Sequence, residues 1–139
     1  MSTYLCFDFG TKSIGVAVGQ LVTETAQPLE AIPARDGIPD WEQVKALHRE
    51  WLPERCIVGI PYNMDGTEQE MTLRARKFGN RLANQCRTQV TMIDERLTTT
   101  DAKARLFELG GYKKLSKGKV DSVSACVIFE NWLEQGMPE

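Results

Sequence analysis

The segment YLCFDFGTKSIGVAV, residues 4–18, most constrains the fold of this chain, because it places a carboxylate, Asp8, inside an apolar run. Aromatic and β-branched residues favour strands and GTKS favours a tight turn, so we predict a hairpin with strands at 4–9 and 14–19. A buried, unpaired carboxylate in such a hairpin costs several kcal/mol of desolvation. We therefore expect a functional role for Asp8; the alternative is a role in forming the turn.

The rest of the chain alternates between strand and helix patterns. Asp40 is a suitable N-cap for one helix, and Thr67 with Glu70 fits a capping box at the start of the next. The order predicts one α/β domain, residues 1–139, with an antiparallel meander of three strands followed by strands joined through right-handed crossovers. Further strands are predicted at about 28–33, 55–60 and 89–93, and helices at about 40–51, 67–86, 98–109 and 120–133.

The composition is that of a soluble globular protein. Hydrophobic residues make up 42% and charged residues 26% of the chain, which argues against intrinsic disorder. The net charge of -2 argues against charge-driven binding of nucleic acid by the whole surface, but it allows local basic patches. No segment approaches the ~18 apolar residues of a membrane span. We expect no signal peptide, because residues 1–10 have neither a basic n-region nor a long apolar stretch. The four cysteines form no CxxC pair, which is typical of reduced thiols, so we expect a cytoplasmic protein with no membrane partner.

Two further carboxylates share the setting of Asp8. Glu95 lies in IDERLTT, after a strand whose carboxyl end is the usual ligand-binding edge of an α/β sheet, and Asp121 lies in the first turns of the last apolar helix. Three acids on three elements suit Mg²⁺ or Mn²⁺, and two such ions suit phosphodiester hydrolysis. Strand alternation leaves open whether Asp94 or Glu95 faces the site, and stabilisation of a helix N-terminus is the alternative role of Asp121.

Several motifs carry a resemblance to a known family: DFGTKSIGVAVG, VGIPYNMDGTEQE, ARKFGNRL, DERLTT and KGKVDSVSA. From residue 4 to about residue 135 the chain resembles the YqgF/RuvX family of pre-16S rRNA nucleases, which are related to Holliday-junction resolvases. The resemblance implies an RNase H-like fold, with a mixed five-stranded sheet flanked by helices, and a cytoplasmic metal-dependent nuclease that trims the 5′ end of the small-subunit rRNA precursor. It places the catalytic and metal-binding acids at Asp8, Glu95 and Asp121. Resolvases of this fold have a fourth acid one helical turn further on, where this chain has Ser124.

Basic residues near the acids are candidates for contacts with nucleic-acid phosphates, which give affinity and register rather than base specificity. For each of them a solvated surface charge is the alternative, and the lysine-rich loop before Asp121 most favours function. In the loop PYNMDG, Tyr62 is a candidate for stacking on a base, although turn formation explains that loop equally well. The candidate phosphate-binding residues are Lys12, Arg74, Lys77, Arg81, Arg96, Lys114, Lys117 and Lys119.

The sequence leaves functions of different classes open. The first is a nuclease acting on pre-16S rRNA in ribosomal precursor particles, as a monomer or a homodimer. The second is a Holliday junction resolvase-like DNA endonuclease with branched DNA as its partner, and the third is a weakly catalytic rRNA-binding assembly factor. The DFGT sequence also resembles the phosphate loop of actin-like ATPases and sugar kinases, but those enzymes need two domains, which 139 residues cannot supply.

Overall fold

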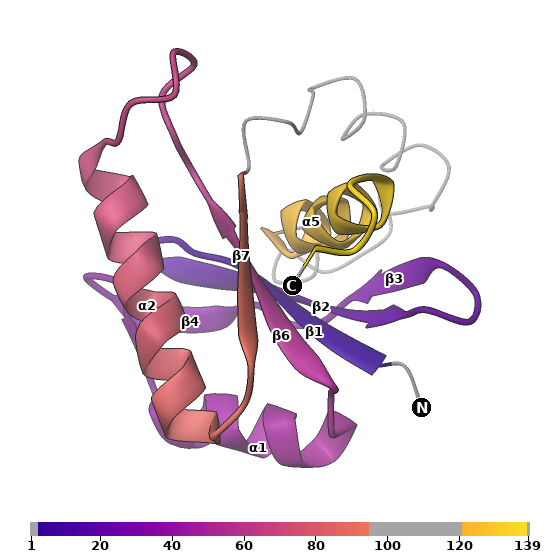
Figure 1. Ribbon diagram of the computed structural model, residues 1–139. Coiled ribbons are helices and arrows are strands. Elements are labelled where there is room, and N and C mark those ends of the chain that lie inside the picture. The colour runs from indigo at the N-terminus through magenta and orange to yellow at the C-terminus, as the bar shows by residue number, and fades with distance from the viewer. Residues whose placement is uncertain (1–2, 95–120, 139) are drawn as a thin grey trace.

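The computed structural model describes residues 3–94 and 121–138 of the chain. Within these residues a mixed sheet of seven strands has α1 and α2 on one face and α5 on the other (Figure 1). This arrangement confirms the predicted α/β class. The strands are β1 (Thr3–Asp8), β2 (Ser13–Gln20), β3 (Thr25–Pro28), β4 (Ile32–Arg35), β5 (Ile38–Pro39), β6 (Arg55–Ile60) and β7 (Val90–Asp94), and the helices are α1 (Trp41–Trp51), α2 (Glu70–Cys86) and α5 (Val123–Glu134).

The strand order β5-β4-β2-β1-β6-β7 places β1 in the middle of the sheet, with β3 also paired to β2. β1 is antiparallel to β2 and parallel to β6, and β6 is parallel to β7. The carboxyl ends of β1, β6 and β7 therefore meet at one edge, where open α/β sheets bind their ligands. The register at this edge pairs Asp8 with Gly59, and Gly59 with Ile93.

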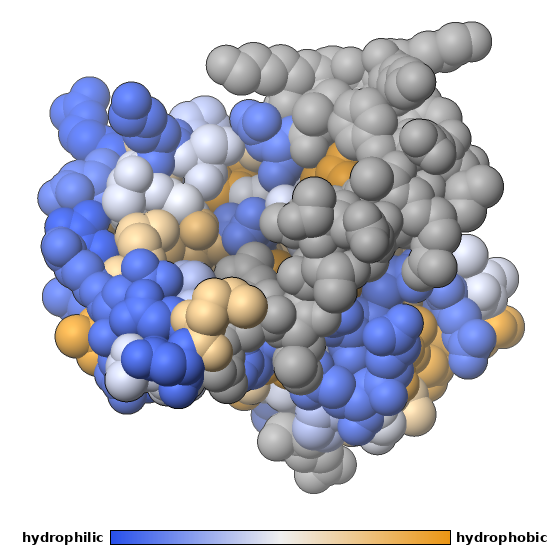
Figure 2. All heavy atoms as spheres, turned by 90° about the horizontal axis from the view of Figure 1, so that it is seen from above, coloured by the Kyte–Doolittle hydropathy of each residue, from blue (hydrophilic) through white to orange (hydrophobic). Residues whose placement is uncertain are grey.

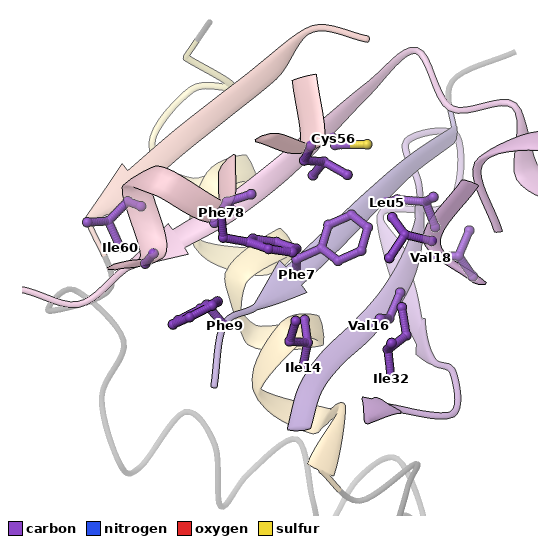
Figure 3. Close-up of a cluster of buried hydrophobic side chains, with 14 residues drawn as sticks. Leu5, Phe7, Phe9, Ile14, Val16, Val18, Ile32, Cys56, Ile60 and Phe78 are labelled. Carbon is purple, nitrogen blue, oxygen red and sulfur yellow. The ribbon is translucent and has the colours of Figure 1, made fainter. Parts of the chain in front are cut away.

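Alternate side chains of the sheet enter two separate cores. Phe7 and Phe9 point into the core beneath α1 and α2, where the ring of Phe78 lies edge-on to that of Phe7, 5.8 Å between centroids (Figure 3). Cys6 points into the core beneath α5. Because side chains alternate along a strand, Asp8 lies on the same face of the sheet as Cys6 and α5.

The prediction of a single third strand at 28–33 is wrong, because the structure divides this region into β3 and β4. Ala17 pairs with Pro28 and Ile14 pairs with Ile32, so two residues of β2 face three residues of the opposing chain. Such a bulge interrupts the ladder of hydrogen bonds and bends the strand. The sheet consequently has more and shorter strands on this side than the five-stranded arrangement that the resemblance implied.

Of the two predicted helix starts on the α1–α2 face, one is confirmed and the other is wrong. Asp40 caps α1 as predicted, and its carboxylate accepts a backbone hydrogen bond of 3.0 Å. The predicted capping box of the next helix is wrong, because α2 begins at Glu70 and its box is formed by Gln69 and Thr72. Thr67 is instead held by hydrogen bonds within the preceding loop.

The remaining helix predictions concern the last third of the chain. The helix predicted at about 98–109 lies outside the described residues. The final predicted helix corresponds to α5, which is buried on most of its circumference against β1, β2 and β3. No helix in the described part of the chain is long and apolar enough to cross a bilayer.

Candidate active site

Asp8 is the last residue of β1 and is half-buried on the α5 face of the sheet. Its partner in β2 is Gly15, and paired residues of an antiparallel ladder have Cα atoms roughly 4.5–5.5 Å apart with side chains on one face. Beneath it, burial raises the pKa of the Cys6 thiol, and the nearby thiols of Cys126 and Cys56 add to this effect. Cys6 therefore stays a neutral thiol and is not a nucleophile.

The residues that lead into α5 pass directly over Gly15. A Cβ atom at Gly15 would lie 2.6 Å from the carbonyl oxygen of Asp121 and 3.2 Å from the Cα of Ser122. Because both neighbours are backbone atoms, only glycine permits this close approach. Asp8 and Asp121, which are far apart in the sequence, are thus neighbours of the same glycine on the same face of the sheet.

Ser122 fixes the start of α5 to the sheet. Its Oγ accepts a buried hydrogen bond of 2.9 Å from the backbone N–H of Val16. Val16 lies opposite the bulge between β3 and β4, where the ladder of hydrogen bonds is interrupted, so the serine hydroxyl satisfies a donor that the sheet leaves unpaired. This hydrogen bond holds the backbone of Asp121 against Gly15, the partner of Asp8 in the β1–β2 ladder.

Asp94 and Asp8 lie on opposite faces of the sheet. Ile93 packs in the core beneath α5, whereas Met92 packs against the core beneath α1 and α2. By alternation, Asp94 faces the α2 side and is not placed to join Asp8. Glu95, the next residue, lies outside the described residues.

The oxygen donors at this edge have the chemistry of a site for a hard divalent cation. Asp8 is half-buried and Asp121 is exposed, and carboxylate oxygens are the preferred ligands of Mg²⁺. Among residues 3–94 and 121–138, no group of three or more His, Cys, Asp or Glu side chains is arranged to hold a metal ion. A three-acid centre therefore needs a carboxylate from elsewhere in the chain. Ser124, in the first turn of α5, is half-buried.

The predicted phosphate-binding residues divide into three sets. Lys12 is exposed in the turn between β1 and β2, close in sequence to Asp8. A second set lies along α2, and its members line a common cleft: Arg74, Lys77 and Arg81. The third set lies outside the described residues: Arg96, Lys114, Lys117 and Lys119.

The cleft has a volume of about 200 Å³ and lies between α2, the start of α1 and the turn that joins β4 to β5. Arg74 crosses it to the carboxylate of Asp36 in that turn, at 3.0 Å, and also pairs with Glu70 at 3.4 Å. Figure 2 looks down on the molecule from above the view of Figure 1; on the side of α2, hydrophilic residues surround paler and apolar ones. The other lining residues are Phe9, Gly37, Ile38, Trp41 and Phe78.

The loop between β6 and α2 forms a compact turn. The N–H of Gly66 donates to the carbonyl of Asn63 at 2.9 Å, and Gly66 has a positive φ, which favours glycine. Tyr62 packs against the core beneath α2, and its hydroxyl accepts a hydrogen bond of 3.0 Å from Arg76. These contacts favour the structural interpretation of the loop over base stacking by Tyr62.

Sequence reasoning missed three residues that shape this end of the molecule. Gly15 interrupts a β-branched run, and an isolated glycine in a strand signals a close backbone approach. Ser122 precedes an apolar run, which is a signal for a helix start. Trp41, the first residue of α1, is half-buried in the α1–α2 core and also lines the cleft.

Comparison with known sequences identifies similar proteins over nearly the whole chain. Residues 2–135 match the RuvX family, which is described as Holliday junction resolvase. A protein of Aeromonas salmonicida (strain A449), named "Putative pre-16S rRNA nuclease", is 64% identical over 93% of this chain and 92% of its own length. A protein of Shewanella oneidensis with the same name is 64% identical over 95% of this chain and 94% of its own length.

Comparison with solved structures identifies proteins that share the fold. RuvC of Thermus thermophilus in complex with a Holliday junction substrate has a TM-score of 0.63 at 13% identity, and the match covers 99% of this chain and 98% of that one. The Holliday junction resolvase of fowlpox virus has a TM-score of 0.52 at 14% identity over 96% of this chain and 99% of that one. The fold is therefore RNase H-like.

Proposed function

Because the chain belongs to the RuvX family, we propose that it is a metal-dependent nuclease that processes the 5′ end of pre-16S rRNA during ribosome biogenesis. The observation that supports this proposal is the approach of the backbone of Asp121 to Gly15, which is the ladder partner of Asp8 at the carboxyl end of β1. The names of the relatives support pre-16S rRNA as the substrate. A cytoplasmic site of action follows from that substrate.

We assign the metal-binding and catalytic roles to Asp8, Glu95 and Asp121. Glu95 is preferred to Asp94 because Asp94 faces the opposite side of the sheet from Asp8. Two Mg²⁺ or Mn²⁺ ions held by these carboxylates would lower the pKa of a bound water and would stabilise the leaving oxygen of a phosphodiester.

The rest of the site holds the acids and the substrate. β1 and the Ser122–Val16 hydrogen bond hold the backbone at the two described acids in place before the RNA binds. Lys12 and the basic residues close in sequence to Glu95 and Asp121 are assigned to neutralise phosphates on either side of the scissile bond: Arg96, Lys114, Lys117 and Lys119.

A cleavage assay on a 5′-labelled fragment of pre-16S rRNA tests the proposal. We expect cleavage with Mg²⁺ or Mn²⁺, none with EDTA, and a loss of at least about a hundredfold for Asp8→Asn, because removal of a charge-stabilising group typically costs that much. Circular dichroism and the urea midpoint verify that Asp8→Asn is folded. The proposal is wrong if the folded wild-type protein cleaves the fragment in neither metal.

The pair Asp94→Asn and Glu95→Gln is a matched control, because the two changes remove one charge each at adjacent positions. We expect Glu95→Gln to lose cleavage as Asp8→Asn does, and Asp94→Asn to retain most of it. The reverse result would transfer the metal-binding role to Asp94 and contradict the alternation along β7.

Cleavage of a four-way DNA junction is the second candidate activity, favoured by the description of the family. Running the same assay on that junction decides between the two substrates. Ser124 stands where resolvases of this fold have a fourth acid. If both nucleic acids bind and neither is cut in any metal, the protein is an rRNA-binding assembly factor and the nuclease proposal fails.

A further inference from the structure

The α2 cleft lies at the same end of the molecule as Asp8, on the opposite face of the sheet. Phe9 follows Asp8 directly, and its side chain lines the cleft and contacts Phe78, 5.6 Å between ring centroids. The N–H of Gly37 donates to the carbonyl of Thr11 at 2.8 Å, so the β4–β5 turn is attached to the loop that follows β1. The cleft is therefore built partly from residues that follow Asp8 directly in the sequence.

The wall of the cleft is aromatic and apolar. The indole of Trp41 stacks on the ring of Phe78, with 5.6 Å between centroids and 19° between planes. Ile38, at the same cleft, has 53% of its surface exposed and adds apolar surface to this wall. Such surfaces bind the flat faces of nucleobases without base preference, because every base has a π-face.

The charge of the cleft is positive, although the chain as a whole has a net charge of -2. Of its three basic residues, Arg74 is neutralised by Asp36 and Glu70. Lys77 and Arg81 are exposed and form no salt bridge with any residue in the described part of the chain. Two cations beside an aromatic wall suit a phosphate that is attached to a base.

The size of the cleft restricts what it can hold. Enclosed sites for whole small molecules measure roughly 300–1,000 Å³, and this cleft measures about 200 Å³. It is therefore better suited to one base and its phosphate than to a complete cofactor. A duplex keeps its bases stacked inside the helix and cannot offer one to such a cleft, whereas a single strand can.

We infer that the cleft binds one unpaired nucleotide of a single-stranded segment of the RNA, with the base against Trp41 and the phosphate at Lys77 and Arg81. This inference rests on the proposed function, because it names the part of the RNA substrate that the nuclease holds. It predicts that the protein prefers RNA with a single-stranded segment beside the cleavage point.

Binding of a fluorescein-labelled RNA of about ten nucleotides, without self-complementarity, tests the inference. The titration is done in EDTA, so that no hydrolysis occurs, and over a range of salt concentrations. Each phosphate contact of a single strand contributes about 0.7 to the slope of log K against log salt. Because both cations contact one phosphate, we expect Lys77→Gln with Arg81→Gln to weaken binding and to reduce the slope by about 0.7.

Variants of Trp41 test the contact with the base. Loss of one stacking contact typically lowers affinity by roughly five- to 150-fold. We expect Trp41→Leu to lower affinity by at least about fivefold without changing the salt slope, and Trp41→Phe to retain most of the affinity. A duplex of the same length should bind equally to Trp41→Leu and to the wild type.

The matched control replaces two exposed basic residues away from the cleft, Arg49→Gln with Arg87→Gln, and should leave the slope closer to that of the wild type. Equal loss of slope in both double variants, or wild-type affinity in Trp41→Leu and the Lys77–Arg81 variant, would overturn the inference. Urea midpoints identify any variant that does not fold. If one of the two, Trp41→Leu or the Lys77–Arg81 double variant, does not fold, the other still tests the inference. If the wild type cleaves RNA and the cleft variants bind RNA as well as the wild type does, the inference about the cleft fails and the nuclease function stands. If the cleft variants bind RNA more weakly but the wild type cleaves it in no metal, the nuclease function fails and the inference about the cleft stands.

Discussion

Replacing Ser122 with alanine tests whether one side-chain hydrogen bond holds the start of α5 against the sheet. The change removes the Oγ atom that accepts the N–H of Val16 at 2.9 Å. Both residues are fully buried, so water cannot replace the lost acceptor. A buried donor left without a partner costs about 1–3 kcal/mol.

The expected change in melting temperature follows from the length of the chain. Unfolding entropy is about 2.1 cal/mol/K per residue, so for 139 residues each kcal/mol lowers the melting temperature by about 3 °C. Ser122→Ala should therefore melt roughly 3–10 °C below the wild type. Urea unfolding followed by circular dichroism should give a lower midpoint with an unchanged slope.

Ser124→Ala is the matched control, because it makes the same chemical change two residues further along. Ser124 is half-buried within the helix, where alanine has the higher helix propensity, by up to about 0.5 kcal/mol. We expect this variant to be as stable as the wild type or slightly more stable. If Ser122→Ala matched the stability of Ser124→Ala, the hydrogen bond to Val16 would not stabilise the fold, and the proposed anchoring of Asp121 would be refuted.

Two further predictions concern Gly15 and His48. Gly15→Ala should lower the free energy of unfolding by about 1–3 kcal/mol and reduce cleavage, because its Cβ would displace the backbone of Asp121. Gly79→Ala should lower it less, because its Cβ meets only the flexible end of Met92, and equal losses would refute this reasoning. Burial lowers the pKa of His48 below its ordinary value of 6.5, so the unfolded chain takes up a proton at higher pH than the folded one does. This contribution to stability is full above about pH 6.5 and is lost as the pH falls toward the folded pKa. His48→Gln removes the only histidine of the chain, so the free energy of unfolding of this variant should depend less on pH in that range. Parallel plots of unfolding free energy against pH for the variant and the wild type would contradict the prediction.

Features encoded by neighbouring residues could be predicted from the sequence. The first hairpin, the alternation that places Asp8 apart from Phe7 and Phe9, and the cap of α1 at Asp40 all depend on short patterns. The capping box of α2 shows the limit of such patterns, since Thr67 and Glu70 fit the usual sequence pattern, whereas Thr67 is held by loop hydrogen bonds and the box is formed by Gln69 and Thr72.

Features that depend on contacts between distant segments were decided only by the tertiary structure. The bulge opposite Val16, the approach of Asp121 to Gly15 and the cleft beside Trp41 each join parts of the chain that no local pattern relates. Strand periodicity alone could not say which face of β7 would turn toward α5; the packing of Ile93 beneath that helix placed Asp94 on the other side. The sequence by itself thus determined which residues could do chemistry. The packing of α5 on the sheet decided that the backbone of Asp121 lies against Gly15, the partner of Asp8, because periodicity encodes which face of an element a residue occupies and only packing brings two faces together.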